Sequence, residues 1–506
     1  MSQLAITQRY GKALGNGEEP QEAPSWISDI DNPWLHGLFA PTTVEMSCSE
    51  LEIEGEIPKD LTGGYFRNGT NPRFKPINRY HWFDGDGMIY AMRFKDGKAT
   101  YQNKWIATKA FQVETEKGKA IWPGILGPFD FSLPISPIKD TGNTDLVFLN
   151  NKLCCLWYES GEVYQVNPFT LETEGVENFN GQLTIPLSAH SKVHPDSGDF
   201  VFFSYGDRPP YMRYGVVTKN NQVHLTHIDL PGPRRPHDIG VTANYSIVHD
   251  FPLFHDPESF NKKSKRVPYF HPDVPTRYGV IPRFGTHKDV KWFEFEPCYM
   301  LHTVNCWEEG DWIVQVGCRT DNPNAVKPKP EDGEIAAKIA FLTLQANLYE
   351  WRMNIRTGET QERPINNENL EFPYINRHYL GRKNRYSYLQ YIPYEAPATF
   401  DALVKFDYET GEMQRYHYGK GVFGSEAPFA PKPNAQDEDD GYVVTYVTDT
   451  NTWKSSCLIF DAKDIEQGPI CKIHIPHRLP AGFHTLWVDG ADLYDNESRK
   501  NTSNTK

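Results

Sequence analysis

Residues 145–157 read DLVFLNNKLCCLW, two short apolar runs separated by two asparagines. Apolar runs of this length are typical of β-strands, and an Asn-Asn pair between them tolerates the backbone of a tight hairpin turn. Turn sequences such as HPDSGDF, NIRTGET and DYETGEM separate further runs of the same kind. These runs are Gly198–Tyr205, Asp311–Cys318, Leu348–Ile355, Leu403–Tyr408, Tyr442–Val447 and Ser456–Phe460. The sequence therefore predicts a chain built mainly of antiparallel hairpins.

Helical periodicity is scarce, and the best candidate for a helix is Glu334–Leu344. Many short strands with few helices favour an all-β fold, either a β-propeller or a large sandwich. No repeat is regular enough to give the number of blades. The polar ends, residues 1–26 and 489–506, are predicted to be tails. Residues 27–488 then form a single domain.

The composition excludes several classes of protein. The chain has 506 residues, a formal net charge of −14 and eight scattered cysteines. An acidic chain without a basic patch is not expected to bind nucleic acid. We find no apolar run long enough to span a membrane and no secretory signal, and the cysteines lack a disulfide spacing. We therefore expect a cytoplasmic protein with reduced thiols.

Four of the seventeen histidines lie next to apolar strands. They are His190 in SAHSKV, His237 in PHDIGVTANY, His302 in LHTVNCWEE and His484 in GFHTLW. Successive members are 47, 65 and 182 residues apart, too far for a local metal motif. A propeller presents the inner strand of every blade to one axis, so these residues can converge there. Four imidazoles would form a metal site, although imidazole suits several transition metals.

Other readings of the histidines remain open at this stage. His249, which also precedes an aspartate, is the closest competitor of His237. If the four histidines are incidental, the chain is a non-catalytic propeller that binds a partner, because a fold does not determine a function. His81 lies beside FDGDG at Phe83–Gly87, which we interpret as a tight structural turn because it lacks the remaining ligands of a calcium loop.

Nine motifs from Glu52 to Trp487 resemble those of the carotenoid cleavage oxygenases, a family with apocarotenoid-cleaving, retinoid-related and stilbene-cleaving members. In order they are YFRNGTNP, HWFDGDGM, GNTDLVF, LSAHSKV, PHDIGVTANY, LHTVNCWEE, LEFPYINRHYLGR, SEAPFAPK with DEDDGY, and GFHTLW. The resemblance implies a seven-bladed β-propeller with a helical and loop cap over one face. It also implies one Fe(II) per chain, bound by His190, His237, His302 and His484.

The same resemblance assigns further roles. Glutamates that orient three of the ligating histidines match Glu159, Glu371 and Glu426. Four ligands on an octahedral ion leave two positions for O2, the co-substrate. The reaction implied is cleavage of a conjugated C=C bond of a carotenoid or apocarotenoid into two carbonyl products, which makes the chain a dioxygenase.

Two features bear on the substrate. Stilbene-cleaving relatives bind a phenolic hydroxyl with a tyrosine and a lysine, which match Tyr101 and Lys139, so a lignostilbene or resveratrol-type substrate is the alternative. The apolar segment Ala120–Ile135, AIWPGILGPFDFSLPI, matches the place where family members carry a membrane-dipping entrance. We expect it to form either a peripheral membrane contact or a buried cap loop.

Overall fold

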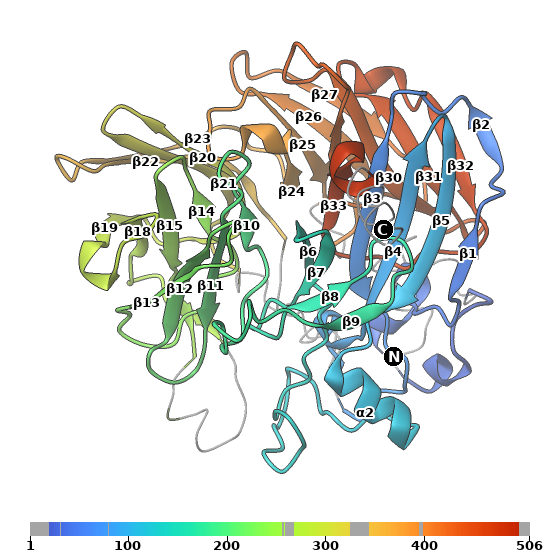
Figure 1. Ribbon diagram of the computed structural model, residues 1–506, viewed down its shortest axis with the longest axis horizontal. Coiled ribbons are helices and arrows are strands. Elements are labelled where there is room, and N and C mark those ends of the chain that lie inside the picture. Colours follow the sequence, from blue (N-terminus) through green and yellow to red (C-terminus); the bar gives the residue numbers. More distant parts are fainter. Residues whose placement is uncertain are drawn as a thin grey trace, which may run out of the picture.

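The computed structural model describes residues 20–30, 32–78, 80–255, 258, 268–323, 344–393 and 398–494. Within these ranges seven of the eight β-sheets are arranged around a common centre (Figure 1). The fold is a seven-bladed β-propeller, as the resemblance implies.

Five blades are four-stranded antiparallel sheets, each made from one continuous part of the chain. Their first strands, β6, β10, β14, β20 and β24, are the innermost, since neighbouring members such as β6 and β10, β14 and β20, and β20 and β24 contact one another. The five sheets consist of β6 (Asp145–Leu149), β7 (Lys152–Leu156), β8 (Tyr164–Val166) and β9 (Thr173–Val176); β10 (Lys192–Val193), β11 (Phe200–Tyr205), β12 (Met212–Val217) and β13 (Val223–Ile228); β14 (Gly240–Val241), β15 (Tyr245–Asp250), β18 (Thr276–Pro282) and β19 (Lys291–Phe295); β20 (Tyr299–Glu309), β21 (Trp312–Thr320), β22 (Asn347–Asn354) and β23 (Thr360–Pro364); and β24 (Leu370–Tyr374), β25 (Tyr386–Tyr391), β26 (Ala402–Asp407) and β27 (Met413–His417). A separate two-stranded ribbon pairs β16 (Leu253–Phe254) with β17 (Tyr269–Phe270).

The two remaining blades join the two ends of the chain and so close the ring. In one, the C-terminal strand β33 pairs with β3, with Thr485 opposite Arg67. In the other, the N-terminal strand β2 pairs with β32. The first sheet contains β33 (Thr485–Asp489), β3 (Gly63–Thr70), β4 (Gly87–Lys95), β5 (Lys98–Trp105) and β1 (Met46–Cys48); the second contains β29 (Phe429–Pro431), β28 (Val422–Phe423), β30 (Gly441–Asp449), β31 (Lys454–Asp461), β32 (Cys471–Ile475) and β2 (Ile53–Gly55).

The hairpin in residues 145–157 forms as predicted. Leu149 pairs with Lys152, and the two residues between them, Asn150 and Asn151, have φ angles of 52° and 62°. Positive φ at both central positions defines the turn whose twist matches that of the flanking strands, and asparagine adopts it more readily than most residues. The other six predicted runs also lie in strands, at β11, β21, β22, β26, β30 and β31.

Short helices and loops cover one end of the ring. Helix α2 (Lys109–Lys117) begins at Thr108, whose side chain accepts from the Phe111 N–H, and ends at Gly118 with φ 67°. Trp34, Trp82 and Phe483 pack into one apolar cluster of this cap. The 3-10 helices are η2 (Ser25–Asp29), η3 (Pro33–Leu35), η4 (Gly37–Phe39), η5 (Trp82–Asp84), η6 (His287–Asp289), η8 (Arg377–Tyr379) and η9 (Ile465–Gln467).

The helix predicted at Glu334–Leu344 lies outside the described residues, apart from Leu344. In the part of the chain that the structure describes, no helix combines the length and the apolar character needed to cross a bilayer.

Candidate metal centre

The four predicted histidines meet at the centre of the ring. His190 precedes β10, His237 precedes β14, His302 lies in β20 and His484 precedes β33. All four are buried, and one nitrogen from each lies within 4.8 Å of the others. Neighbouring ring centroids are 4.4–5.2 Å apart. Four of the seven blades thus each contribute one imidazole, from a strand or from the residues just before it, and we call this group the tetrad.

The other three blades each contribute a carboxylate beside the tetrad. Asp145 is the first residue of β6, Glu371 lies in β24 and Glu426 precedes β29. Glu371 Oε2 lies 2.5 Å from Nδ1 of His302. Glu426 Oε1 lies 3.0 Å from Nδ1 of His484. A carboxylate that accepts from Nδ1 fixes the tautomer and ring direction, and leaves Nε2 free to bind a metal.

Both glutamates are themselves fixed by the backbone. Glu371 Oε2 also accepts from the Phe372 N–H at 2.7 Å. Glu426 Oε2 accepts from the Thr485 N–H at 2.5 Å and from its hydroxyl at 2.8 Å. These bonds leave little freedom for either carboxylate to turn away from its histidine.

Asp145 acts on the third histidine by a different contact, and the sequence interpretation missed it. Its Oδ2 accepts from the backbone N–H of His190 at 3.1 Å and lies 3.8 Å from Nδ1 of that ring. His190 has φ 60°, a left-handed conformation that costs a non-glycine residue about 1–3 kcal/mol. The carboxylate helps to hold this strained backbone. The sequence signal that could have identified Asp145 is its position in GNTDLVF, at the start of a strand.

The tetrad is suited to a transition metal ion. Burial lowers the pKa values of His190 and His237 well below their usual range and that of His302 to about 3. Burial also disfavours the charged form of His484, but the carboxylates of Glu426, Asp145 and Asp238 together outweigh burial, so the pKa of His484 is shifted upward. Neutral imidazole is the form that coordinates metals. The buried Nε2 atoms of His190 and His302 have no hydrogen-bond partner, as expected of atoms that face an ion.

A buried ion pair links three of the tetrad segments. Lys192 Nζ contacts Asp238 Oδ1 and also donates to the carbonyl of His190 at 3.1 Å. Asp238 Oδ2 accepts from the Thr303 N–H at 2.8 Å. The β20–β21 register shifts on both sides of Thr303, which releases this N–H from the strand ladder. Asp238 follows His237 and Thr303 follows His302, so one carboxylate ties their backbones together.

Glu159 does not contact the tetrad in the way the resemblance implied. Its carboxylate lies 3.4 Å from Nη1 of Arg235, whose Nη2 lies 2.5 Å from Asp207. Glu159 lines a cavity beside His237, together with Tyr158 and Arg235. A guanidinium is a strong, charge-assisted partner for a carboxylate, so Glu159 is drawn toward Arg235.

Tyr101 and Lys139, the candidates for binding a phenol, both face other partners. Tyr101 is fully buried between two blades, and its hydroxyl lies 2.8 Å from Nε2 of His477. Lys139 forms ion pairs with Asp86 at 2.5 Å and Glu114 at 2.6 Å. Neither is among the residues that line the cavities around the tetrad.

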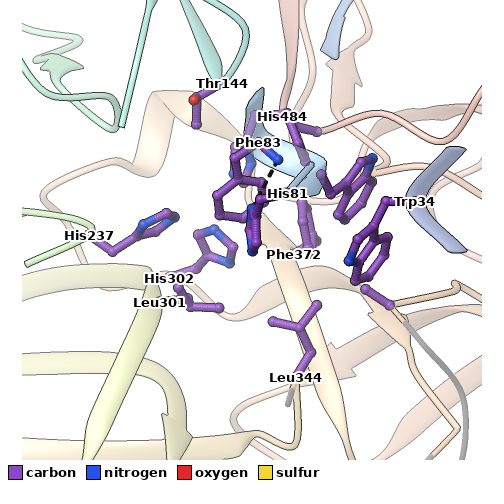
Figure 2. A pocket seen from close by; sticks show the side chains of 13 residues that line it. Trp34, His81, Phe83, Thr144, His237, Leu301, His302, Leu344, Phe372 and His484 are labelled. Atoms are coloured by element: carbon purple, nitrogen blue, oxygen red, sulfur yellow. Dashed lines mark hydrogen bonds between the residues drawn. The ribbon is translucent and has the colours of Figure 1, made fainter. Parts of the chain in front are cut away.

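Two largely apolar cavities meet at the tetrad. The first, of about 600 Å³, is shown in Figure 2, where His237 and His302 lie at the left and His484 at the top. The second has about 730 Å³ and contains the polar groups of Glu159 and Arg235. They share His81, Phe83, His237 and Leu301, which form what we call the junction. The remaining lining residues of the first cavity are Trp34, Trp82, Thr144, Leu344, Phe372, Ala398 and Phe483.

A third cavity, of about 650 Å³, also reaches the tetrad and is polar. Asp145, Lys192, Asp238, Arg377 and Glu426 line it with His190, His302 and His484. The tetrad thus separates an apolar space suited to an organic substrate from a polar space that can hold water.

A closed propeller with four buried histidines at its centre and apolar cavities beside them combines a candidate metal site with space for an organic ligand. Residues 39–489 match the family model described as retinal pigment epithelial membrane protein. The chain is 34% identical to carotenoid 9,10(9',10')-cleavage dioxygenase 1 of Arabidopsis thaliana, with 91% of each chain covered. It therefore belongs to the carotenoid cleavage oxygenase family and is an oxygenase.

Stilbene-cleaving proteins are also similar to the chain. Resveratrol cleavage oxygenase 1 of Aspergillus fumigatus is 29% identical, with 92% of this chain and 97% of that protein covered. The crystal structure of a Pseudomonas brassicacearum lignostilbene dioxygenase superposes with a TM-score of 0.81 at 25% identity, covering 91% of this chain and 99% of that one.

Proposed function

We propose that the tetrad binds one Fe(II) and that the chain cleaves a conjugated C=C bond of a carotenoid or apocarotenoid with O2, which gives two aldehydes or ketones. The observation that carries this proposal is the junction, where two apolar cavities meet beside the tetrad. A long polyene can extend into both cavities and place an internal double bond next to the metal. Both atoms of O2 are accounted for, one in each carbonyl product.

The iron, when bound, supplies the redox chemistry that activates O2. The residues of the chain position the reactants. Glu371 and Glu426 orient two ligating rings through Nδ1, as their hydrogen bonds support. Phe83, Phe372 and Phe483 offer rigid apolar faces that hold the polyene and exclude water. Holding the double bond in a fixed position selects which bond is cut.

A phenolic stilbene is the second candidate. The polar groups of the second cavity, Glu159 and Arg235, offer hydrogen bonds that a hydroxyl on an aromatic ring can use. The Tyr101 and Lys139 pairings described above weaken the original basis for this candidate. The higher identity to carotenoid-cleaving relatives favours the polyene.

We further propose a peripheral membrane contact around residues 120–135. Phe131 and Ile135 are 60% and 61% exposed, and the nearby Ile77 is 57% exposed. Asn78 donates to the Gly127 carbonyl at 3.1 Å, which fixes this neighbour beside the segment. Ile125 and Leu126 of the same segment line the second cavity. An apolar surface that continues into a substrate cavity suits the uptake of a polyene from a bilayer. The eight unpaired cysteines support a reducing compartment such as the cytoplasm.

Product identification tests the choice of substrate. The iron-loaded protein is incubated with an apocarotenal and with resveratrol, and the carbonyl products are identified by mass spectrometry. The proposal predicts cleavage of the apocarotenal and none by the His237→Ala variant. Cleavage of resveratrol alone would transfer the assignment to the stilbene, and cleavage of neither would contradict the oxygenase substrate classes proposed here.

A further inference from the structure

His81 is a buried histidine at the junction, and one of its two ring nitrogens has a fixed role. It is 5% exposed and lies at the N-cap of η5. Nδ1 accepts from the backbone N–H of Phe83 at 3.1 Å. The His81 N–H in turn donates to Asp84 Oδ2 at 2.9 Å, which completes a capping box. The ring is therefore held by the turn that the sequence FDGDG forms.

This capping bond decides which tautomer the ring adopts. A backbone N–H can only donate, so Nδ1 must be the unprotonated nitrogen and the neutral ring carries its proton on Nε2. Burial lowers the pKa of His81 to about 4, although the Glu159 carboxylate opposes the shift, so the ring is neutral at physiological pH. His81 consequently presents one N–H donor at Nε2.

The Nε2–H donor has no partner in the described part of the chain. The same ring lines both apolar cavities, as Phe83 and His237 do, and Figure 2 shows it in the first of them, close to Phe83. A donor left unpaired in an apolar cavity costs about 1–3 kcal/mol, so a fully apolar substrate would gain nothing from it. An acceptor oxygen on the substrate would satisfy it.

Resting on the proposed function, we infer that His81 selects substrates that carry an acceptor oxygen, a carbonyl, hydroxyl or phenol, within reach of its ring when the double bond to be cut lies beside the tetrad. The hydrogen bond runs from Nε2–H to that oxygen. His81 is thus a specificity-determining residue, and the substrate class narrows from polyenes in general to oxygenated ones. Because the ring lines the same two cavities as His237, the same bond sets how far the oxygenated group lies from the tetrad.

Ligand binding to the metal-free protein tests this inference separately from turnover. Trp34 and Trp82 line the first cavity, so quenching of tryptophan fluorescence reports occupancy. The probes are an apocarotenal and a hydrocarbon polyene of the same conjugated length. One neutral hydrogen bond predicts that the wild type binds the aldehyde about 10-fold more tightly.

Two variants remove the donor in different ways. His81→Phe keeps a ring without nitrogen. His81→Asn keeps the N-cap, since an asparagine oxygen can accept from Phe83 N, but its shorter side chain withdraws the donor from the cavity. Both are expected to lose the preference for the aldehyde. His249→Gln, a buried histidine outside the cavities, is the control and is expected to keep the preference.

The outcomes distinguish the role inferred for His81 from the proposed cleavage of polyenes. If the wild type prefers the aldehyde and His81→Asn binds both probes equally, the inference holds. If His81→Asn keeps the full preference, or the wild type shows none, His81 has no such role and the proposed function stands. If the wild type binds neither probe, the polyene function itself fails, and this inference with it.

Discussion

Lys192 and Asp238 form a buried ion pair that connects the backbones of His190, His237 and His302. Their side chains are 15% and 3% exposed, and the Asp238 carboxylate also accepts from Ile239 N and Thr303 N. Breaking a buried pair leaves one charge without its partner, which is strongly destabilising locally. Glu426 holds the backbone beside the fourth histidine, His484. Its carboxylate accepts from the N–H and the hydroxyl of Thr485, the next residue in the chain.

Lys192→Met is therefore expected to weaken metal binding by about 10-fold or more, as loss of a residue that supports a metal ligand commonly does. The affinity for Co(II) is measured by competition with a chelator. Lys405→Met is the matched control, because Lys405 and Asp439 form a similarly buried pair at 2.6 Å, in another part of the propeller. Equal Co(II) affinities in the two variants would show that Lys192 does not support the metal site.

The length of the first cavity is expected to limit the length of the substrate that the protein can cleave. Ala398 lines this cavity and does not line the second. Ala398→Trp fills part of the space, so we expect kcat/KM for a long carotenoid to fall about 100-fold through misplacement of the double bond. Turnover of a substrate short enough to use the second cavity alone, and the metal content, should change little. An equal fall in kcat/KM for short and long substrates would contradict the two-cavity arrangement.

Membrane binding is expected to depend on the exposed apolar residues of 120–135. Phe131→Ser combined with Ile135→Ser removes two side chains that would insert into a bilayer. We expect at least a 10-fold (~1.4 kcal/mol) loss of affinity for phospholipid vesicles, from the apolar area lost. Cosedimentation measures it. Phe284→Ser, which removes a side chain that is 52% exposed elsewhere, is the control. Unchanged binding in the double variant would exclude this segment as the contact.

The free energy of unfolding is expected to fall as the pH is lowered from 6.5 to 5, in part because of His249. Burial lowers the pKa of this fully buried residue to about 4. The unfolded chain takes up the proton below pH ~6.5 while the folded chain does not, so acidification favours unfolding. Between pH 7 and pH 5, the free energy of unfolding of His249→Gln is expected to fall by about 2 kcal/mol less than that of the wild type. Urea denaturation at both values measures this, and parallel losses would show that His249 is not responsible.

Local patterns predicted the strands, and the family motifs predicted the tetrad. The turn at Asn150–Asn151 depends on two adjacent residues, so sequence alone could identify it. The blade count and the convergence of His190, His237, His302 and His484 required the family resemblance, because no local signal spans gaps of up to 182 residues.

The partners of individual side chains were harder to predict, since they depend on contacts between distant segments. Glu159 was assigned to a histidine but lies beside Arg235, 76 residues away. Tyr101 was assigned to the substrate but pairs with His477, 376 residues away. Asp145 was not singled out, although it begins the innermost strand next to His190. A motif gives a residue its place in the fold but does not determine which neighbour its side chain meets.

The metal content of the anaerobically reconstituted protein tests the central claim most directly. Chains loaded with Fe(II) and freed of excess metal are analysed by mass spectrometry, alongside the His190→Ala and His302→Ala variants and the His249→Gln control. The tetrad predicts about one iron per chain in the wild type and in His249→Gln, and a loss of most of it in the two tetrad variants. Full iron content in a folded double variant, His190→Ala with His302→Ala, would contradict the metal centre and the oxygenase mechanism built on it.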